Sequence, residues 1–138
     1  MAYRVSSGQF VDGAAGNANP IPVASTGVKY SKAIKLAFSS YFSLSYQLAS
    51  SGSPDVQIDL EHSVDGNPPL NEGASSTNFI VPGAITSIET DLTNKNWNMK
   101  EVQPVTCVWV RLKLTGKNAN PSDTTFNGYF FEQSDIDW

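Results

Sequence analysis

The chain has 138 residues, 40% apolar and 11% aromatic, a content that allows one globular domain with its own hydrophobic core. The net charge is −4 and no cluster of Lys and Arg is present to neutralise phosphates, so we expect no nucleic-acid partner. No run approaches the ~18 apolar residues of a membrane span, which argues against a membrane partner. The first ten residues contain no apolar stretch of signal-peptide type, and the single cysteine excludes an internal disulfide, so we expect synthesis in a host cytoplasm.

Residues 1–27 differ in composition from the rest of the chain. They are rich in Gly, Ala, Asn and Pro, with isolated apolar residues such as Phe10, Ile21 and Val23. A segment of this kind cannot close a core of its own. We therefore expect an extended N-terminal arm over residues 1–27, either loosely ordered or lying along a neighbouring subunit, followed by a domain over residues 28–138 with a short C-terminal tail.

From residue 28 onward, strands are predicted in quick succession. Residues 28–38 favour one or two strands, and residues 41–50 and 56–62 each show a period of two in hydrophobicity. The turn-forming sequence SGSPD separates the last two. The apolar residues expected to face the core are Ile34, Leu36 and Phe38, then Phe42, Leu44, Tyr46 and Leu48, then Val56, Ile58 and Leu60.

The second half of the chain continues this pattern. Residues 66–77 predict a polar loop, and NFIVPG predicts a short strand that ends at Pro82. Residues 84–99 are ambiguous between a strand and a single helical turn. Residues 105–116 form the strongest predicted strand, with Val108, Val110, Leu112 and Leu114 expected to face the core, and residues 124–133 form the last. The spacing of the strands predicts an all-β fold, either a sandwich or a barrel, and of the two we expect an antiparallel β-sandwich.

A cluster of polar residues at 59–65 could be catalytic, metal-binding or structural. It contains Asp59, Glu61, His62 and Asp65. On a strand, Asp59 and Glu61 share the polar face while His62 points to the other face, and Asp65-Gly66 is a strong turn signal. A calcium loop would need a longer acidic stretch with alternating oxygen ligands. We interpret the cluster as a strand edge and the turn after it.

No other pattern predicts catalysis. His62 is the only histidine, Cys107 has no second cysteine for a metal site, and neither a nucleophile elbow nor a phosphate-binding glycine loop occurs. The sequence therefore predicts a protein that is not an enzyme and that has no catalytic residue, cofactor or metal.

Exposed aromatic residues are the stronger candidates for function. Trp109 shares a strand face with Arg111 and Lys113, and Trp97 lies in the polar sequence NKNWNM. Both could fill an interface pocket or stack on sugar rings, although Trp109 could equally be covered by a loop of its own domain. The acidic, aromatic terminus could dock on a neighbour or fray. The candidate interface residues are Phe10, Ile21, Val23, Trp97, Trp109, Ile136 and Trp138.

Two stretches resemble small β-sandwich virion proteins of tailed bacteriophages, and most closely the head decoration, or cement, proteins. These are QIDLEHSVDGNPPL, which ends a strand in a Ser-x-Asp-Gly turn, and VTCVWVRLKLTGKNANPSDTTFNGYFFEQ. The resemblance covers roughly residues 55–133. It implies a jelly-roll-like fold, a homotrimer and a position on the outside of a capsid built from a different, major capsid protein. It carries over no catalytic residue.

Two functions follow as hypotheses. In the first, the chain is a decoration protein on the virion surface that stabilises contacts between capsomers, because binding only the mature shell favours that state. In the second, it is a carbohydrate- or receptor-binding module of a tail or fibre, with Trp97, Trp109 and Tyr129 as stacking platforms for a glycan.

Overall fold

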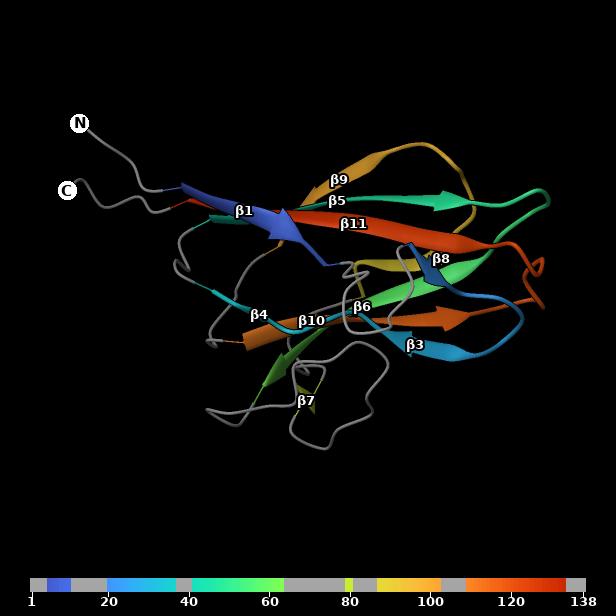
Figure 1. Cartoon of the computed structure of the whole chain (residues 1–138), viewed down its shortest axis with the longest axis horizontal. Coiled ribbons are helices and arrows are strands. Elements are labelled where there is room, and N and C mark those ends of the chain that lie inside the picture. The colour runs from blue at the N-terminus through green and yellow to red at the C-terminus, as the bar shows by residue number, and fades with distance from the viewer. Residues whose placement is uncertain are drawn as a thin grey trace.

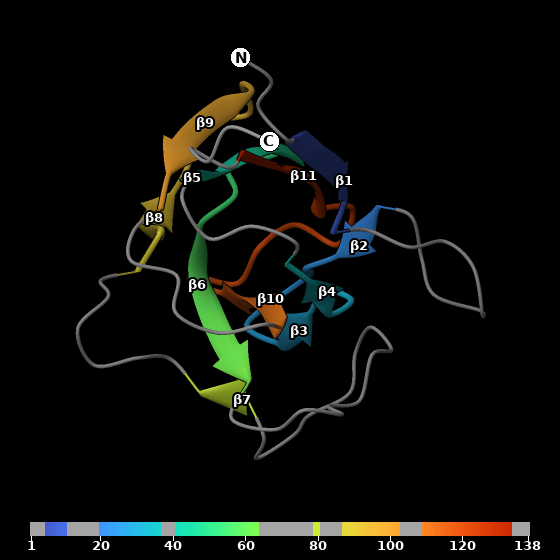
Figure 2. The same ribbon diagram turned by 90° about the vertical axis from the view of Figure 1, so that its left-hand side faces the viewer.

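The chain folds into two antiparallel β-sheets that pack face to face (Figure 1 and Figure 2). The computed structural model describes residues 5–10, 20–36, 41–63, 79–80, 87–102 and 109–133. Over these residues the regular elements are all strands, joined by turns and loops, and no helix occurs. Accordingly, this part of the chain has no helix that could cross a membrane. The predicted all-β sandwich is confirmed.

Each sheet combines strands from distant parts of the sequence. The first sheet has the order β1-β11-β5-β9, with β2 also paired to β11, and the second has the order β3-β10-β6-β7, with β4 paired to β10 and β8 to β6. The strands of the first sheet are β1 (Val5–Gln9), β2 (Ile21–Pro22), β5 (Tyr41–Ala49), β9 (Asn98–Glu101) and β11 (Thr125–Gln133). Those of the second are β3 (Val28–Tyr30), β4 (Ile34–Lys35), β6 (Val56–Ser63), β7 (Phe79–Ile80), β8 (Glu89–Leu92) and β10 (Trp109–Gly116).

The core lies between the sheets and is built from alternate residues of the long strands. Because successive side chains on a strand point to opposite faces, one apolar row per strand is enough to line it. The predicted inward residues of β5, β6 and β10 are all buried, as are Ile34 and Leu36, whereas Phe38 and Val108 lie outside the described residues. The buried members on these three strands are Phe42, Leu44, Tyr46, Leu48, Val56, Ile58, Leu60, Val110, Leu112 and Leu114.

The described part of the N-terminal segment belongs to the sandwich, so the arm expected over residues 1–27 is wrong for residues 5–10 and 20–27. β1 pairs with β11 along its whole length, and β2 pairs with the start of β11. The ladder continues past β1, since the backbone N–H of Phe10 donates to the carbonyl oxygen of Gly128 at 2.9 Å. A segment without hydrophobic periodicity is thus held through its backbone by a strand from the far end of the sequence.

Three of the residues expected to anchor such an arm are core residues instead. Phe10 is fully buried, and Ile21 and Val23 are almost so. The Phe10 ring packs edge-on against Phe130 and Phe42, with ring centroids 5.7 and 6.5 Å apart. Their side chains leave no surface for a neighbouring subunit, so they are withdrawn as interface residues.

The turn between β10 and β11 is fixed by Asn120. Its side-chain amide donates to the carbonyl oxygens of Ser25 and Asp55, and its side-chain oxygen accepts the N–H of Asp55 at 2.6 Å. Gly116 ends β10 at this point, and a Cβ there would lie 2.3 Å from the Ser25 carbonyl oxygen, so only glycine allows this approach. The N-terminal segment is therefore tied to both sheets at this end of the sandwich.

Candidate functional site

The polar cluster on β6 is structural rather than catalytic in its described part. β6 lies inside the second sheet, between β10 on one side and β7 and β8 on the other, so its interpretation as a strand edge is wrong. Asp59 and Glu61 share the outer face, as the alternation predicts, but both are buried, and His62 is buried on the inner face. Asp65 lies outside the described residues.

Glu61 forms a buried ion pair with Arg111. The register places the two residues directly opposite each other, and Nε of Arg111 donates to Oε1 of Glu61 at 2.8 Å. The guanidinium group also lies 4.0 Å from the centroid of the Tyr30 ring, a cation–π contact. Arg111 is only 1% exposed, so this pair holds β3, β6 and β10 together and offers no charge to a ligand.

Asp59 is also satisfied within the sheet. One carboxylate oxygen accepts the Ser87 hydroxyl, and the other accepts the side-chain amide of Gln57 at 3.1 Å. Within the described ranges, no group of three or more His, Cys, Asp or Glu residues is placed to hold a metal ion.

His62 is a buried titratable group with an unsatisfied atom. Its Nε2 is buried and has no hydrogen-bond partner among the described residues, and burial lowers the pKa of the imidazole below its usual value. Because the unfolded chain binds the proton more readily than the folded one, His62 contributes stability above about pH 6.5, which is lost as the pH falls through the lowered pKa.

We therefore expect His62 to make the protein less stable on mild acidification. The measurement is the free energy of urea unfolding at pH 7.5 and at pH 5.5, a window above most carboxylate titrations. In His62→Leu, the decrease in the free energy of unfolding between pH 7.5 and pH 5.5 should be smaller than in the wild type. The free energy of unfolding at pH 7.5 should stay equal or rise, because an unpaired buried polar atom costs ~1–3 kcal/mol. An equal drop in both proteins would contradict this role.

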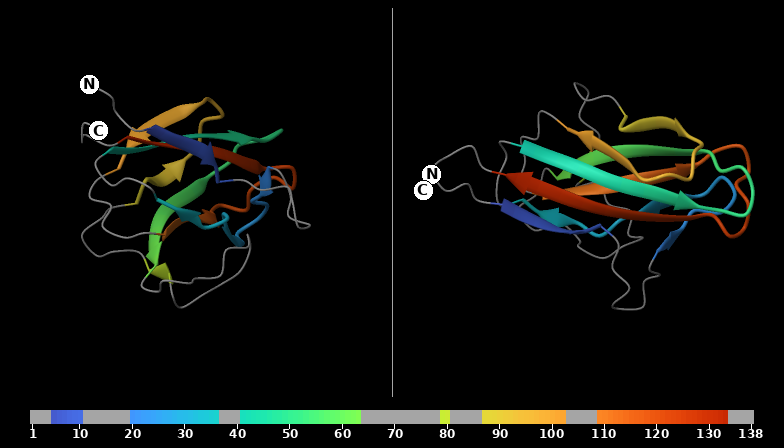
Figure 3. Two further views of the ribbon diagram at one scale, coloured as in Figure 1. Left: turned by 60° about the vertical axis from the view of Figure 1, so that its left-hand side comes forward. Right: turned by 90° about the horizontal axis from the view of Figure 1, so that it is seen from above.

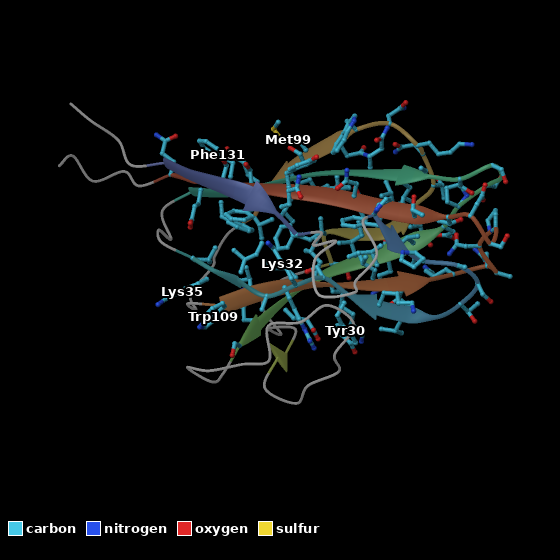
Figure 4. All side chains as sticks on the ribbon, viewed as in Figure 1. Tyr30, Lys32, Lys35, Met99, Trp109 and Phe131 are labelled. Carbon is cyan, nitrogen blue, oxygen red and sulfur yellow. The ribbon has the colours of Figure 1, made fainter. Side chains whose placement is uncertain are left out.

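The candidate site that the structure does assemble lies on the outer side of the first sheet. Trp97, Met99, Tyr129 and Phe131 are exposed there by 50%, 74%, 36% and 42%. We call these four residues the aromatic face. Figure 3, seen from above, shows β1, β11, β5 and β9 side by side, and Figure 4 shows Met99 and Phe131 on the same sheet.

The register explains how residues distant in sequence form one surface. Tyr129 pairs with Ser45 and Ser45 pairs with Met99, so these three form a row across β11, β5 and β9. The next row runs from Phe131 through Ser43 to Glu101. Small serines on β5 therefore separate two lines of larger side chains. Among the described outward residues of these strands, Glu101 alone is charged.

Trp97 meets Tyr129 at one end of this face. Their ring centroids are 5.7 Å apart and the ring planes are tilted by 40°. Both rings remain partly exposed, so the pair presents a contiguous aromatic surface. Trp109 is not part of it, because it lies on β10 in the second sheet and is half-buried.

A network of side-chain hydrogen bonds holds the loop that carries Trp97. Asn98 donates to Asn94 and to the carbonyl oxygen of Asn96, and Asn94 also accepts the backbone N–H of Asn96. Lys95 is tied to the β5–β6 turn through the carbonyl oxygens of Ser50 and Gly52. Hydrogen bonds within the chain thus hold the loop on which the exposed indole lies.

The sequence predicted only part of this surface. Of the seven candidate interface residues, Trp97 alone lies on the aromatic face, and Ile136 and Trp138 are outside the described residues. Tyr129, named as a stacking platform, is there too. Met99 and Phe131 were missed, although both could have been found, because Phe131 alternates with the inward residues of β11 and Met99 follows Trp97 by two.

Comparison of the sequence with models of protein families, with curated proteins and with solved structures finds no match.

Proposed function

We propose that the chain is a structural virion protein of the decoration type, which acts by binding the major capsid protein on the outside of a phage head. The observation that carries this proposal is the aromatic face, four large apolar side chains exposed together on the outer side of the first sheet. The resemblance of residues 55–133 to decoration proteins supports the choice of partner.

The composition of the aromatic face suits a protein partner. Trp, Tyr, Phe and Met are enriched in the buried centres of protein interfaces, and charged residues are depleted there. The face has the first four types at its centre and a single carboxylate, Glu101, towards one side. Large contiguous apolar patches on a soluble protein commonly mark interaction sites.

The area of the sheet supplies part of an interface. Strands β1, β11, β5 and β9 have 5, 9, 9 and 4 residues, which at ~3.4 Å per residue and about 4.8 Å between strands cover on the order of 400–450 Å². A standard interface buries about 800 Å² per partner. The face would supply about half of one such contact, and repeated copies on a shell would add avidity.

Phe131→Glu tests this proposal. A carboxylate at the centre of the interface would be desolvated without a partner, so we expect capsid binding to weaken by at least about 30-fold, the size of a hot-spot loss. The measurement is co-sedimentation of the purified chain with capsids assembled from the major capsid protein of the same virus. Val28→Glu is the matched control, because Val28 is equally exposed (43%) but lies on β3 in the second sheet.

Unchanged binding by Phe131→Glu, or an equal loss in Val28→Glu, would contradict the assignment of the face. Thermal melting of both variants verifies that the fold persists, and neither residue belongs to the buried core.

A second candidate function is carbohydrate binding, favoured by the contact between Trp97 and Tyr129. Two partly exposed rings with centroids 5.7 Å apart can stack on the apolar face of a neutral sugar. Glycan binding that Trp97→Ala abolishes, together with capsid binding that survives Phe131→Glu, would favour this function over the first.

A further inference from the structure

β9 forms one margin of the first sheet, and its outer edge is open within the described part of the chain. It pairs with β5 on one side, and no described strand pairs with it on the other. Figure 2 shows β9 at the outer end of the sheet. Met99 at its centre is 74% exposed, the highest value among the exposed large hydrophobic side chains.

The backbone of β9 turns specific groups towards this open edge. The N–H of Val102 donates to the carbonyl oxygen of Phe42 at 2.9 Å, so every second residue back along the strand bonds to β5. Those residues are Lys100 and Asn98. The N–H and C=O groups of Met99 and Glu101 must therefore point away from β5.

The edge lacks two of the devices that usually block strand pairing, because β9 has no proline and no bulge, although the strand is only four residues long. Its lysine, Lys100, turns towards β8, where it donates to the carbonyl oxygen of Ile88 and lies 3.5 Å from Glu89. The margin formed by β3 and β4 differs, because it has Lys29, Lys32 and Lys35 within seven residues (Figure 4 labels the last two).

The other margin of the first sheet is a weaker candidate. β1 also has one side without a described strand, but its described side chains are Ser7, Gly8 and Gln9. None of them is a large apolar group that pairing would remove from water. The β9 edge combines unpaired backbone groups with Met99 and the neighbouring Trp97.

We propose that two copies of this chain associate by antiparallel pairing of their β9 strands. Met99 of one copy lies opposite Met99 of the other, and Glu101 of each lies opposite Trp97 of the other. This register brings together the backbone groups that point away from β5 in both copies. The two first sheets then form one continuous sheet.

The charges along β9 favour this register over its neighbours. On the inner side, Lys100 of each copy lies opposite Asn98 of the other, so no like charges are opposed. A register centred on Glu101 would place the two Glu101 carboxylates directly opposite each other, which is destabilising. A register centred on Trp97 would leave most of β9 unpaired.

The pairing has a consequence for the aromatic face. A two-fold axis perpendicular to the sheet keeps both outer faces on the same side, so the two aromatic faces adjoin and the docking surface doubles. The pairing itself does not depend on the proposed function, because it is a property of the free protein. It differs from the homotrimer implied by the family resemblance, since this contact closes with two copies.

Met99→Pro is the decisive variant. Proline removes the N–H that points away from β5 and is tolerated at such edge positions, while Asn98 before it is already extended. We expect light scattering at about 100 μM to give wild type a mass near twice the 14.9 kDa of one chain, and Met99→Pro the mass of one chain.

Met99→Ala is the matched control for the side chain. It keeps the N–H, so we expect it to remain a dimer with at most ~10-fold weaker association. Near-ultraviolet circular dichroism checks that both variants are folded. Phe131→Glu should keep the dimer even where it loses capsid binding, which separates this inference from the proposed function.

Three results would overturn the pairing. These are a wild-type protein that is a monomer or a trimer, a Met99→Pro variant that is still a dimer, and a Met99→Ala variant that is as fully monomeric as Met99→Pro.

Discussion

Replacing Arg111 with methionine is expected to lower the free energy of unfolding by about 3–5 kcal/mol. The guanidinium group is 1% exposed and lies 2.8 Å from the Glu61 carboxylate, which is itself buried. Methionine fills a similar volume but leaves a buried carboxylate without its cation and removes the contact with the Tyr30 ring. Urea unfolding at pH 7 measures the loss.

The double variant Arg111→Met/Glu61→Leu is the control for this expectation. Replacing both members of a buried pair by apolar residues is often close to neutral, so the double variant should regain much of the stability that the single variant loses. A double-mutant cycle then gives the coupling between the two groups. A loss below about 1 kcal/mol in Arg111→Met would mean that the pair is not desolvated as the structure places it.

Replacing Phe10 with alanine is expected to cost about 3–5 kcal/mol, the range for a large aromatic side chain deleted from a core. The ring is fully buried and touches Phe42 and Phe130. The measurement is again urea unfolding. Gln9→Ala is the matched control on the same segment, because the Gln9 side chain is exposed and its loss should change stability by less than about 0.5 kcal/mol.

This experiment separates an arm from an integral strand. If residues 1–27 were an arm outside the domain, Phe10→Ala would leave stability unchanged, and a chain without residues 1–24 would fold as well as the full one. The structure predicts the opposite for both, because β1, β2 and the Phe10 ring complete the first sheet and the core.

The long strands were predictable because each has one face in the core and a contrasting face outside. In β5 the order Phe42, Ser43, Leu44, Ser45 shows this alternation directly, and β10 shows it through Val110, Leu112 and Leu114. The same local information correctly placed Asp59 and Glu61 on one face of β6. Periodicity depends only on neighbours in sequence, so one sequence is enough to read it.

The burial of that charged face was not predictable in the same way. Asp59 and Glu61 on one strand face normally indicate a face exposed to solvent. Here Glu61 is buried because Arg111 lies opposite it, and this register joins strands about fifty residues apart in the sequence. The N-terminal error has the same origin. Ser7, Gly8 and Gln9 show no strand pattern of their own, because their hydrogen bonds are supplied by β11.

The aromatic face was half predictable for a related reason. Trp97 stands out in a polar sequence, and a large apolar residue there needs a cover or a partner. Phe131 is less conspicuous, since it adjoins Phe130, and only the alternation along β11 shows that the two rings point to opposite sides. When a strand has large apolar residues on both faces, composition alone does not show which of them are exposed.

The position of β11 affects how the protein can be made. β11 is the last of the described strands, yet it lies between β1 and β5 in the first sheet and also binds β2. During synthesis, β1 and β2 have no ladder to join until residues 125–133 have left the ribosome. Until then β5 has no partner on the side that β11 occupies. The first sheet can therefore close only after residues 125–133 have been made, and pairing between such distant segments favours slow folding with apolar surface exposed in the meantime.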